Sequence, residues 1–274
     1  GGSVKFTIWT DMSVASTAIN ESVDVDAVAL ADSQVTLTFE EYGNAANTTF
    51  KVRATSFIPL DRSITNVIGY NAGLSMDTIA RDKLKAGTNV RYATGGSTDP
   101  TARNTVEPGD IITSHDIRLV VTDLRAANAA DFNGKYAGVL HPHVALDLRE
   151  ETGTAAWRDP HVYSDPRNIW SDEIGEYEGV RWMVTSQAPV FADAGSSTTL
   201  TDVYRSMVWG QQALAKGYST FEGRGAYPKI GFGPVVDKME RFRPVYWHFF
   251  GNWGIFRQAA LRAIESSATV ATNS

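Results

Sequence analysis

The chain has 274 residues, of which 43% are hydrophobic and 20% charged, and its net charge is −6. This composition supports one large core or two modest ones and argues against wholesale disorder. The chain has no cysteine, which excludes disulfides, thiolate metal sites and cysteine nucleophiles and fits assembly in a reducing cytoplasm.

The acidic balance, with a pI near 5.4, argues against a dedicated nucleic-acid reader and leaves only local, non-specific contacts with DNA. No apolar run approaches about 18 residues and no basic-then-apolar segment opens the chain, so we expect neither a membrane span nor a signal peptide. The chain begins with Gly1, Gly2 and Ser3, which fits proteolytic trimming or a remnant of recombinant expression.

The first predicted element is a long β-hairpin. Apolar and polar side chains alternate over residues 35–39 and again over 50–54, on either side of a turn at Gly43 and Asn44. Its arms are about 30 Å long with a single apolar face. That face needs cover, and composition alone favours cover from the hairpin's own domain.

A helix is predicted next, over residues 63–86, because apolar residues recur there at three- and four-residue steps. Gly87 closes this helix, and Gly69 and Gly73 are candidate breaks within it. The Gly-, Thr-, Asn- and Pro-rich residues 88–109 predict a long loop.

The middle of the chain predicts a second helix, a strand and a third helix. Thr113 and Asp116 form a capping box before a helix that starts at Ser114. Residues 136–140 are typical of a strand, and Pro142 suits the first turn of the helix that follows. The apolar stripe of the second helix comprises Ile117, Val120, Val121 and Leu124.

The last third of the chain consists of short apolar runs separated by Gly and Pro. Helical spacing is plausible over 203–214, and residues 254–267 fit either a strand or a helix. The predicted fold class is therefore α+β.

The stretch NIWSDEIGEYEGVRWMVTS, residues 168–186, raises the question of carbohydrate chemistry. Glu176 and Glu178 lie near Trp170 and Trp182, and carboxylate pairs beside aromatic side chains are what glycoside hydrolases use. In one continuous strand the two carboxylates would project about 7 Å apart from the face that carries Trp182. This shared face favours solvent or subunit contacts over catalysis.

Other constellations that could carry chemistry have simpler interpretations. His141, His143 and Asp147 are zinc-ligand types, but a helix cap or loop position explains His141 without a further ligand cluster. The glycines of 223–233 precede no Lys-Ser/Thr pair and are typical of turns. No enzyme motif remains, so we expect no catalytic residue, cofactor or metal.

Four further segments, taken in order, are KAGTNVRYATGG (85–96), AGVLHPHVALDLREET (137–152), IGEYEGVRWMVTS (174–186) and VYRSMVWGQQALAKG (203–217). As an ordered set they resemble the major capsid proteins of tailed double-stranded-DNA phages, in the N-four-like branch. The matching residues are Gly87 to Val90, His141 and Pro142, Asp147 to Arg149, and Gly175 to Arg181. The family's Asp-Pro-Leu near the return to the peripheral domain is absent, since GPVVDKMERFRP stands there.

The resemblance implies the Hong Kong ninety-seven capsid fold. The implied segments are an N-terminal arm at 1–14, an E-loop at 15–57, a peripheral domain with a spine helix at 58–133 and 234–274, and an axial domain at 134–233. It also implies a structural subunit that forms hexamers and pentamers around packaged DNA. The alternatives are an encapsulin-like compartment shell and a carbohydrate-active enzyme.

The implied setting is the virion capsid, assembled in the host bacterial cytoplasm. Portal, scaffold and decoration proteins are the partners this implies besides further copies of the chain. The apolar face of the hairpin would then lie on a neighbouring subunit. The candidate subunit contacts are Phe39, Glu40, Lys51, Arg53, Trp170, Glu176, Glu178 and Arg181.

Overall fold

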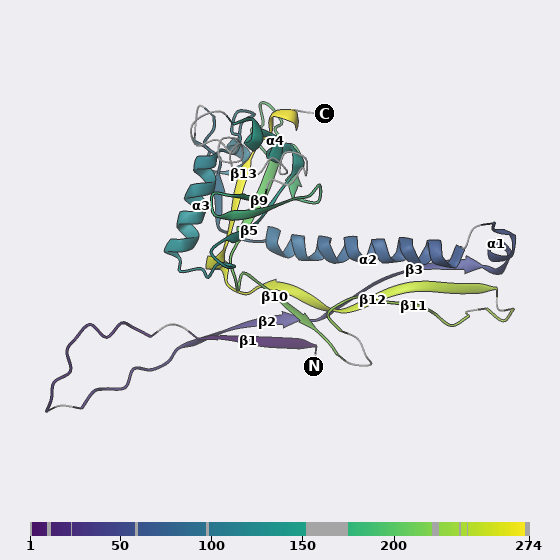
Figure 1. Ribbon diagram of the computed structural model, residues 1–274, viewed down its shortest axis with the longest axis horizontal. Coiled ribbons are helices and arrows are strands. Elements are labelled where there is room, and N and C mark those ends of the chain that lie inside the picture. The colour runs from purple at the N-terminus through teal and green to yellow at the C-terminus, as the bar shows by residue number, and fades with distance from the viewer. Residues whose placement is uncertain are drawn as a thin grey trace. The chain divides into compact units, whose positions relative to one another are not determined.

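The computed structural model describes residues 2–9, 12–22, 24–57, 60–96, 99–151, 175–220, 225–235, 237–239 and 241–271. These residues form an α+β structure (Figure 1). It divides into two compact units, the first made of residues 1–72 and 216–252 and the second of 73–215 and 253–274.

The first unit contains a two-stranded ribbon of β1 (Ser3–Trp9) and β2 (Asp32–Thr38). The strands run antiparallel from the pair Ser3 and Thr38 to the pair Trp9 and Asp32. The predicted first arm, residues 35–43, is confirmed as a strand over 35–38, whereas residues 40–43 belong to the next strand and the predicted partner, 50–54, is wrong. The actual partner supplies a matching apolar row on alternate residues, formed by Val4, Phe6 and Ile8.

A second sheet of the first unit is built on the pairing of β3 (Glu40–Thr49) with β12 (Phe242–Ile255). The predicted turn at Gly43 and Asn44 therefore lies in mid-strand. Gly43 is needed there, because a Cβ would lie 2.8 Å from the carbonyl oxygen of Trp247. The sheet is completed by β10 (Leu214–Tyr218) and β11 (Lys229–Phe232).

Helix α1 (Phe50–Thr55) takes the place of the predicted second hairpin arm. Thr49 caps it, since its side chain accepts a hydrogen bond from the Val52 backbone N–H. A single capped turn competes well with a strand at this point, because a Thr oxygen satisfies an otherwise unpaired N–H.

Helix α2 (Leu60–Lys85) confirms the predicted long helix and extends it to 26 residues, about 39 Å. It runs unbroken through Gly69 and Gly73. Packing offsets the low helix propensity of glycine here. A Cβ on Gly69 would lie 3.5 Å from the Ile230 side chain, and the Trp247 indole N–H donates to Asn71 Oδ1 at 2.8 Å.

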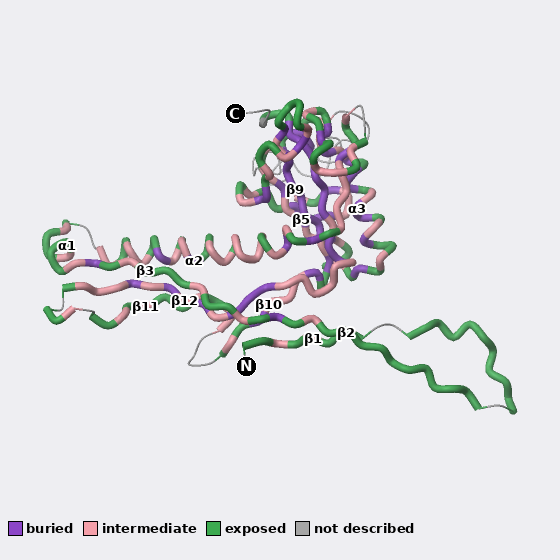
Figure 2. The backbone as a smooth tube through the Cα atoms, turned by 180° about the vertical axis from the view of Figure 1, so that it is seen from behind, coloured by how far each residue is buried: buried purple, intermediate pink, exposed green. Residues whose placement is uncertain are grey.

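The second unit is organised around a seven-stranded sheet with the order β4-β13-β9-β5-β7-β6, in which β8 also pairs with β9. The strands are β4 (Val90–Tyr92), β5 (Tyr136–Leu140), β6 (Glu176–Tyr177), β7 (Val180–Val184), β8 (Val190–Phe191), β9 (Val203–Trp209) and β13 (Leu261–Ser266). Figure 2 shows β5 and β9 as largely buried strands.

Helices α3 (Ser114–Ala126) and α4 (Pro142–Glu150) confirm the predicted helices of this unit. The capping box of Thr113 and Asp116 is present, and all four residues of the predicted apolar stripe are buried. His141 caps α4, as predicted, because its Nδ1 accepts the His143 backbone N–H at 3.2 Å. Short 3₁₀ helices occupy Arg103–Thr105, Gln258–Ala260 and Thr269–Ala271.

The predicted helical spacing over 203–214 is wrong. Residues 203–208 are all buried, because β9 lies inside the sheet with covered faces, and a strand buried on both faces loses its period of two. Residues 254–267 fitted either a strand or a helix, and residues 261–266 form strand β13, which pairs antiparallel with β9.

A buried ion cluster ties these two strands to α2. Glu265 is 0% exposed and accepts two hydrogen bonds from Arg103, at 2.9 and 2.6 Å. Arg205, also buried, lies 3.5 Å from Glu265 and donates to the carbonyls of Lys85 and Gly87. Arg205 thus caps the end of α2, where unpaired carbonyls favour a cation.

We expect Glu265→Gln to lower the free energy of unfolding by about 3–5 kcal/mol, because the change leaves the buried Arg205 without a counter-charge. Urea unfolding of the isolated subunit measures this. The control is Glu107→Gln, an exposed position expected to change stability by about 0.5 kcal/mol or less. Equal losses in the two variants would contradict a special role for the cluster.

Candidate subunit contacts

The predicted residues Glu176, Glu178 and Arg181 lie on a tight hairpin between β6 and β7. Glu176 pairs with Arg181 across it, and the turn residues Glu178 and Gly179 have φ of 50° and 77°. Two successive positive φ values are typical of a type I′ turn. The prediction of one continuous strand with both carboxylates on one face is therefore wrong, and the turn accounts for Gly179.

A pocket of about 650 Å³ opens beside this hairpin, and we call it the hairpin pocket. Its lining comprises Phe132, Asn133, Lys135, Tyr136, Ala137, Glu176, Arg181, Trp182 and Met183. Lys135 and Glu176 form an ion pair, Arg181 is exposed, and the apolar Phe132 and Met183 are 45% and 50% exposed. Apolar side chains ringed by charges are typical of a protein contact surface.

The hairpin pocket does not favour glycoside hydrolysis. Among the described residues, Glu176 is the only carboxylate that lines it, and Lys135 engages that carboxylate, whereas glycosidases need two carboxyl groups across the scissile bond. Trp182 is 2% exposed and packs against Gly138, where a Cβ would lie 2.5 Å from the indole. The indole therefore belongs to the core and offers little face to a sugar.

Phe39 and Glu40 follow the ribbon of the first unit. The Phe39 ring packs edge-on against Phe250, with centroids 5.6 Å apart, so much of it is covered within its own chain. Glu40 is exposed and accepts a hydrogen bond from the Tyr42 hydroxyl. Burial of Tyr42, together with this hydrogen bond, raises the pKa of Tyr42 to about 12.

Lys51 and Arg53 lie on α1 rather than on a strand. Lys51 is exposed, while Arg53 forms an ion pair with Asp61 at 2.9 Å. Trp170 lies outside the described residues. The first-unit residues Phe39, Glu40, Lys51 and Arg53 remain predicted contacts. Glu40 and Lys51 are the exposed ones among them.

The predicted subunit contacts include no residue of the loop between β1 and β2, although the implied E-loop, 15–57, covers most of it. Every described residue of 12–31 is exposed, as Figure 2 shows along its length. Its described residues nevertheless include six large apolar side chains, Met12, Val14, Ile19, Val25, Val28 and Leu30. Between Lys5 and Lys51 the sequence has seven carboxylates and no basic residue, a charge pattern that could have marked this segment.

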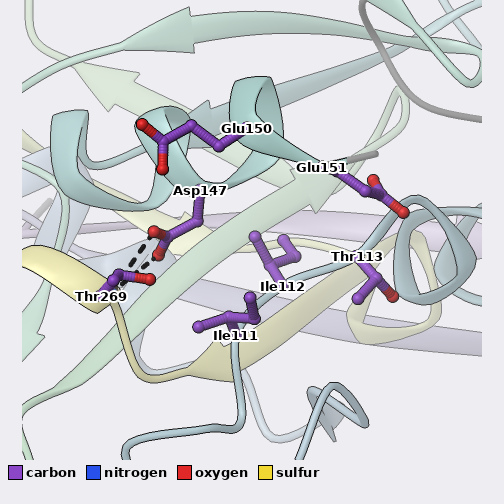
Figure 3. Close-up of a pocket in the computed structure, with 7 residues that line it drawn as sticks. All are labelled: Ile111, Ile112, Thr113, Asp147, Glu150, Glu151 and Thr269. Carbon is purple, nitrogen blue, oxygen red and sulfur yellow. Dashed lines mark hydrogen bonds between the residues drawn. The ribbon is translucent and has the colours of Figure 1, made fainter. Parts of the chain in front are cut away.

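A second pocket, of about 390 Å³, lies beside α4 and is lined by Ile111, Ile112, Thr113, Asp147, Glu150, Glu151 and Thr269 (Figure 3). Two of its carboxylates already have partners. Asp147 accepts the Thr269 backbone N–H at 3.1 Å, and Glu151 accepts the N–H and hydroxyl of Ser114 at 3.0 and 2.8 Å. Within the described residues, no group of three or more His, Cys, Asp or Glu side chains is placed to share a metal ion.

A family model described as phage capsid protein matches residues 1–257. The chain belongs to this phage capsid family. Solved structures agree with the match: the capsid of Ralstonia phage GP4 has a TM-score of 0.79 and 14% identity, over 98% of this chain and 84% of that one. The head structure of Helicobacter pylori bacteriophage KHP40 has a TM-score of 0.74 and 11% identity, over 96% and 85%.

A third similar structure is the capsid of cyanophage P-SCSP1u, with a TM-score of 0.71 and 10% identity over 98% of this chain and 84% of that one. The search of curated proteins gave no match. At these identities the likeness shows the fold, and the predicted Hong Kong ninety-seven type is confirmed. The family match confirms the resemblance to phage major capsid proteins and does not favour the encapsulin alternative.

This capsid protein is thus a structural subunit of an icosahedral phage head, and copies of it assemble into the capsid lattice. No helix in the described part of the chain is both long and apolar enough to cross a membrane.

The capsid protein should lose stability with acid through His141. Burial, with a smaller effect of His143, lowers the pKa of His141 from 6.5 to about 4. Below pH 6.5 the unfolded chain binds a proton at His141, whereas the folded chain binds it only near pH 4. The free energy of unfolding therefore falls as the pH is lowered from 6.5 to 4.

His141→Asn tests this window, because Asn keeps a helix-capping acceptor and does not titrate. Free energies of unfolding of the subunit, measured from pH 7.5 to 4, should decline less steeply for the variant between pH 6.5 and 4. Parallel profiles for the two proteins would show that His141 does not contribute.

Proposed function

We propose that this capsid protein forms hexamers and pentamers that close into an icosahedral head around double-stranded DNA, and that residues 3–38 act as its E-loop. Under this proposal the loop at 12–31 lies on an adjoining subunit. The earlier limits of the E-loop, 15–57, thereby shift toward the N-terminus, because the strands of the hairpin are β1 and β2.

The observation that carries the proposal is the exposure of apolar side chains along the loop 12–31. Val14 and Ile19 are 89% and 78% exposed. Exposed large apolar side chains concentrated on one segment, rather than scattered singly over the surface, mark sites of association. An adjoining copy supplies the cover that the loop lacks.

We call the surface on which the loop of an adjoining copy would bind the landing surface. It lies where β3 passes into α1 and along β11. It presents the apolar Phe50, Phe57 and Phe232, which are 67%, 106% and 45% exposed, and the exposed cations Lys51 and Lys229. The loop is acidic, so the two surfaces complement each other in charge as well as in hydrophobicity.

Further partners follow from the same proposal. Portal, scaffold and decoration proteins would meet the shell, and packaged DNA would be touched through scattered basic side chains without sequence readout. Assembly takes place in the host bacterial cytoplasm. Nuclease-protected DNA inside the particles separates this function from an enzyme-loaded compartment.

The proposal is tested by removing the apolar character of the loop. Replacing the six large apolar residues named above with Ser leaves the ribbon ladder intact. The subunit should therefore keep its circular dichroism and unfolding midpoint, while shells disappear from negative-stain micrographs and sedimentation profiles. A matched variant, with Ser13, Ser16, Thr17 and Ser22 changed to Ala, should still assemble.

A charge test addresses the landing surface separately. Lys51→Glu with Lys229→Glu should raise the subunit concentration needed for assembly about tenfold or more. Normal shells from the Ser-substituted loop, or a density map with the ribbon and loop covered only by their own chain, would contradict the proposal.

A further inference from the structure

Leu200 combines two unusual properties. Its φ is 47°, in the left-handed region that non-Gly residues, leucine included, seldom adopt. Its side chain is 52% exposed, so burial in its own chain does not compensate for the strain. Glycine or asparagine would suit this backbone better. Strained, exposed positions of this kind cluster at functional sites.

Leu200 stands on a rigid support, residues 192–202, which we call the leucine loop. The Gly195 N–H donates to Thr201 O at 2.9 Å, and the Leu200 N–H donates to Ser196 O at 2.9 Å. The Ser196 N–H donates to Val106 O at 2.8 Å, which anchors the loop to the unit. The loop therefore presents the leucine in a fixed position, with little entropy left to lose on binding.

The hairpin pocket lies toward the other end of β9. The leucine loop leads into Val203, the first residue of that strand. At the far end, Trp209 pairs with the pocket residue Ala137, and the Gln211 N–H donates to Ala130 O, two residues before Phe132. The two ends of β9 are about 20 Å apart.

The two surfaces differ in charge in a complementary way. The leucine loop holds Asp193 and Asp202 and no basic residue, whereas the hairpin pocket presents Arg181 and Lys135, the latter paired with Glu176. A surface with an apolar knob among carboxylates thus matches an apolar pocket beside cations.

We propose that Leu200 of one copy inserts into the hairpin pocket of the next copy around the ring, against Phe132 and Met183, with Asp193 facing Arg181. Because knob and pocket are different surfaces of one chain, each copy offers one to each neighbour, and such head-to-tail contacts close into rings. This inference rests on the proposed function, and it names the partner of the pocket.

The absence of cysteine from the chain makes a direct test possible. In a chain carrying both Leu200→Cys and Phe132→Cys, a disulfide within one copy is excluded, because the ends of β9 are about 20 Å apart and a disulfide spans about 7 Å between Cα atoms. Oxidised shells should give a non-reducing ladder that ends at five and six chains. Each single variant should give no ladder.

A second variant distinguishes an effect of Leu200 on assembly from an effect on folding stability. Leu200→Asn relieves the backbone strain, so the unfolding midpoint should stay the same or rise, while shell formation should require about tenfold more subunit. Leu200→Met, which keeps the apolar knob, should assemble. Arg181→Glu alone should weaken assembly, and Arg181→Glu with Asp193→Arg should restore it.

Normal shells from Leu200→Asn, without any ladder from the cysteine pair, would overturn the knob contact and leave the proposed function standing. A ladder from Phe132→Cys with Val14→Cys would also overturn it, since the loop 12–31 would then be the occupant of the pocket. Failure of the unaltered chain to form rings or shells would overturn the proposed function, and the contact with it.

Discussion

The pairing of β9 with β13 is the interaction on which the second unit depends. It brings the last strand of the chain against the middle of the sheet, and Glu265 lies directly opposite Arg205 in the register. A charge pair at the centre of a core is costly to desolvate, so it is tolerated only when hydrogen bonds complete it. Here Arg103 and the carbonyls at the end of α2 supply those bonds. The cluster thereby fixes which strand, loop and helix end meet.

The two units differ in how they bury their apolar side chains. The second unit buries a continuous core between its sheet and helices α3 and α4, and its exposed apolar side chains include those at the hairpin pocket and Leu200. The first unit spreads its apolar residues along a ribbon, a loop and one end of a sheet. A subunit of this kind reaches its full complement of contacts only within a lattice, where many modest interfaces add together.

Local signals in the sequence were sufficient for helices α2, α3 and α4, but they missed α1 and were insufficient for the long-range pairings. The capping box at Thr113 and the cap at His141 act within a few residues, so pattern alone located α3 and α4. The ribbon strand at 35–38 was also recognisable, but its partner 3–9 lies across a loop of more than 20 residues, and nothing local distinguishes it from 50–54. At β9, complete burial erased the alternation that would have marked a strand. Among the predicted contacts, Glu176 and Arg181 meet at one pocket, whereas Glu178 was assigned to a strand although its neighbour Gly179 signals a turn.

The charge pattern of the exposed loop has a practical consequence for following assembly by limited digestion. Trypsin cuts only after lysine or arginine, and the sequence offers neither between Lys5 and Lys51. Survival of this stretch in trypsin is therefore a property of its composition and carries no information about whether a neighbour shields it. Glu21 lies in the middle of the loop and is exposed in the single subunit, so a glutamate-specific protease would report directly on how accessible the loop is in free and assembled protein.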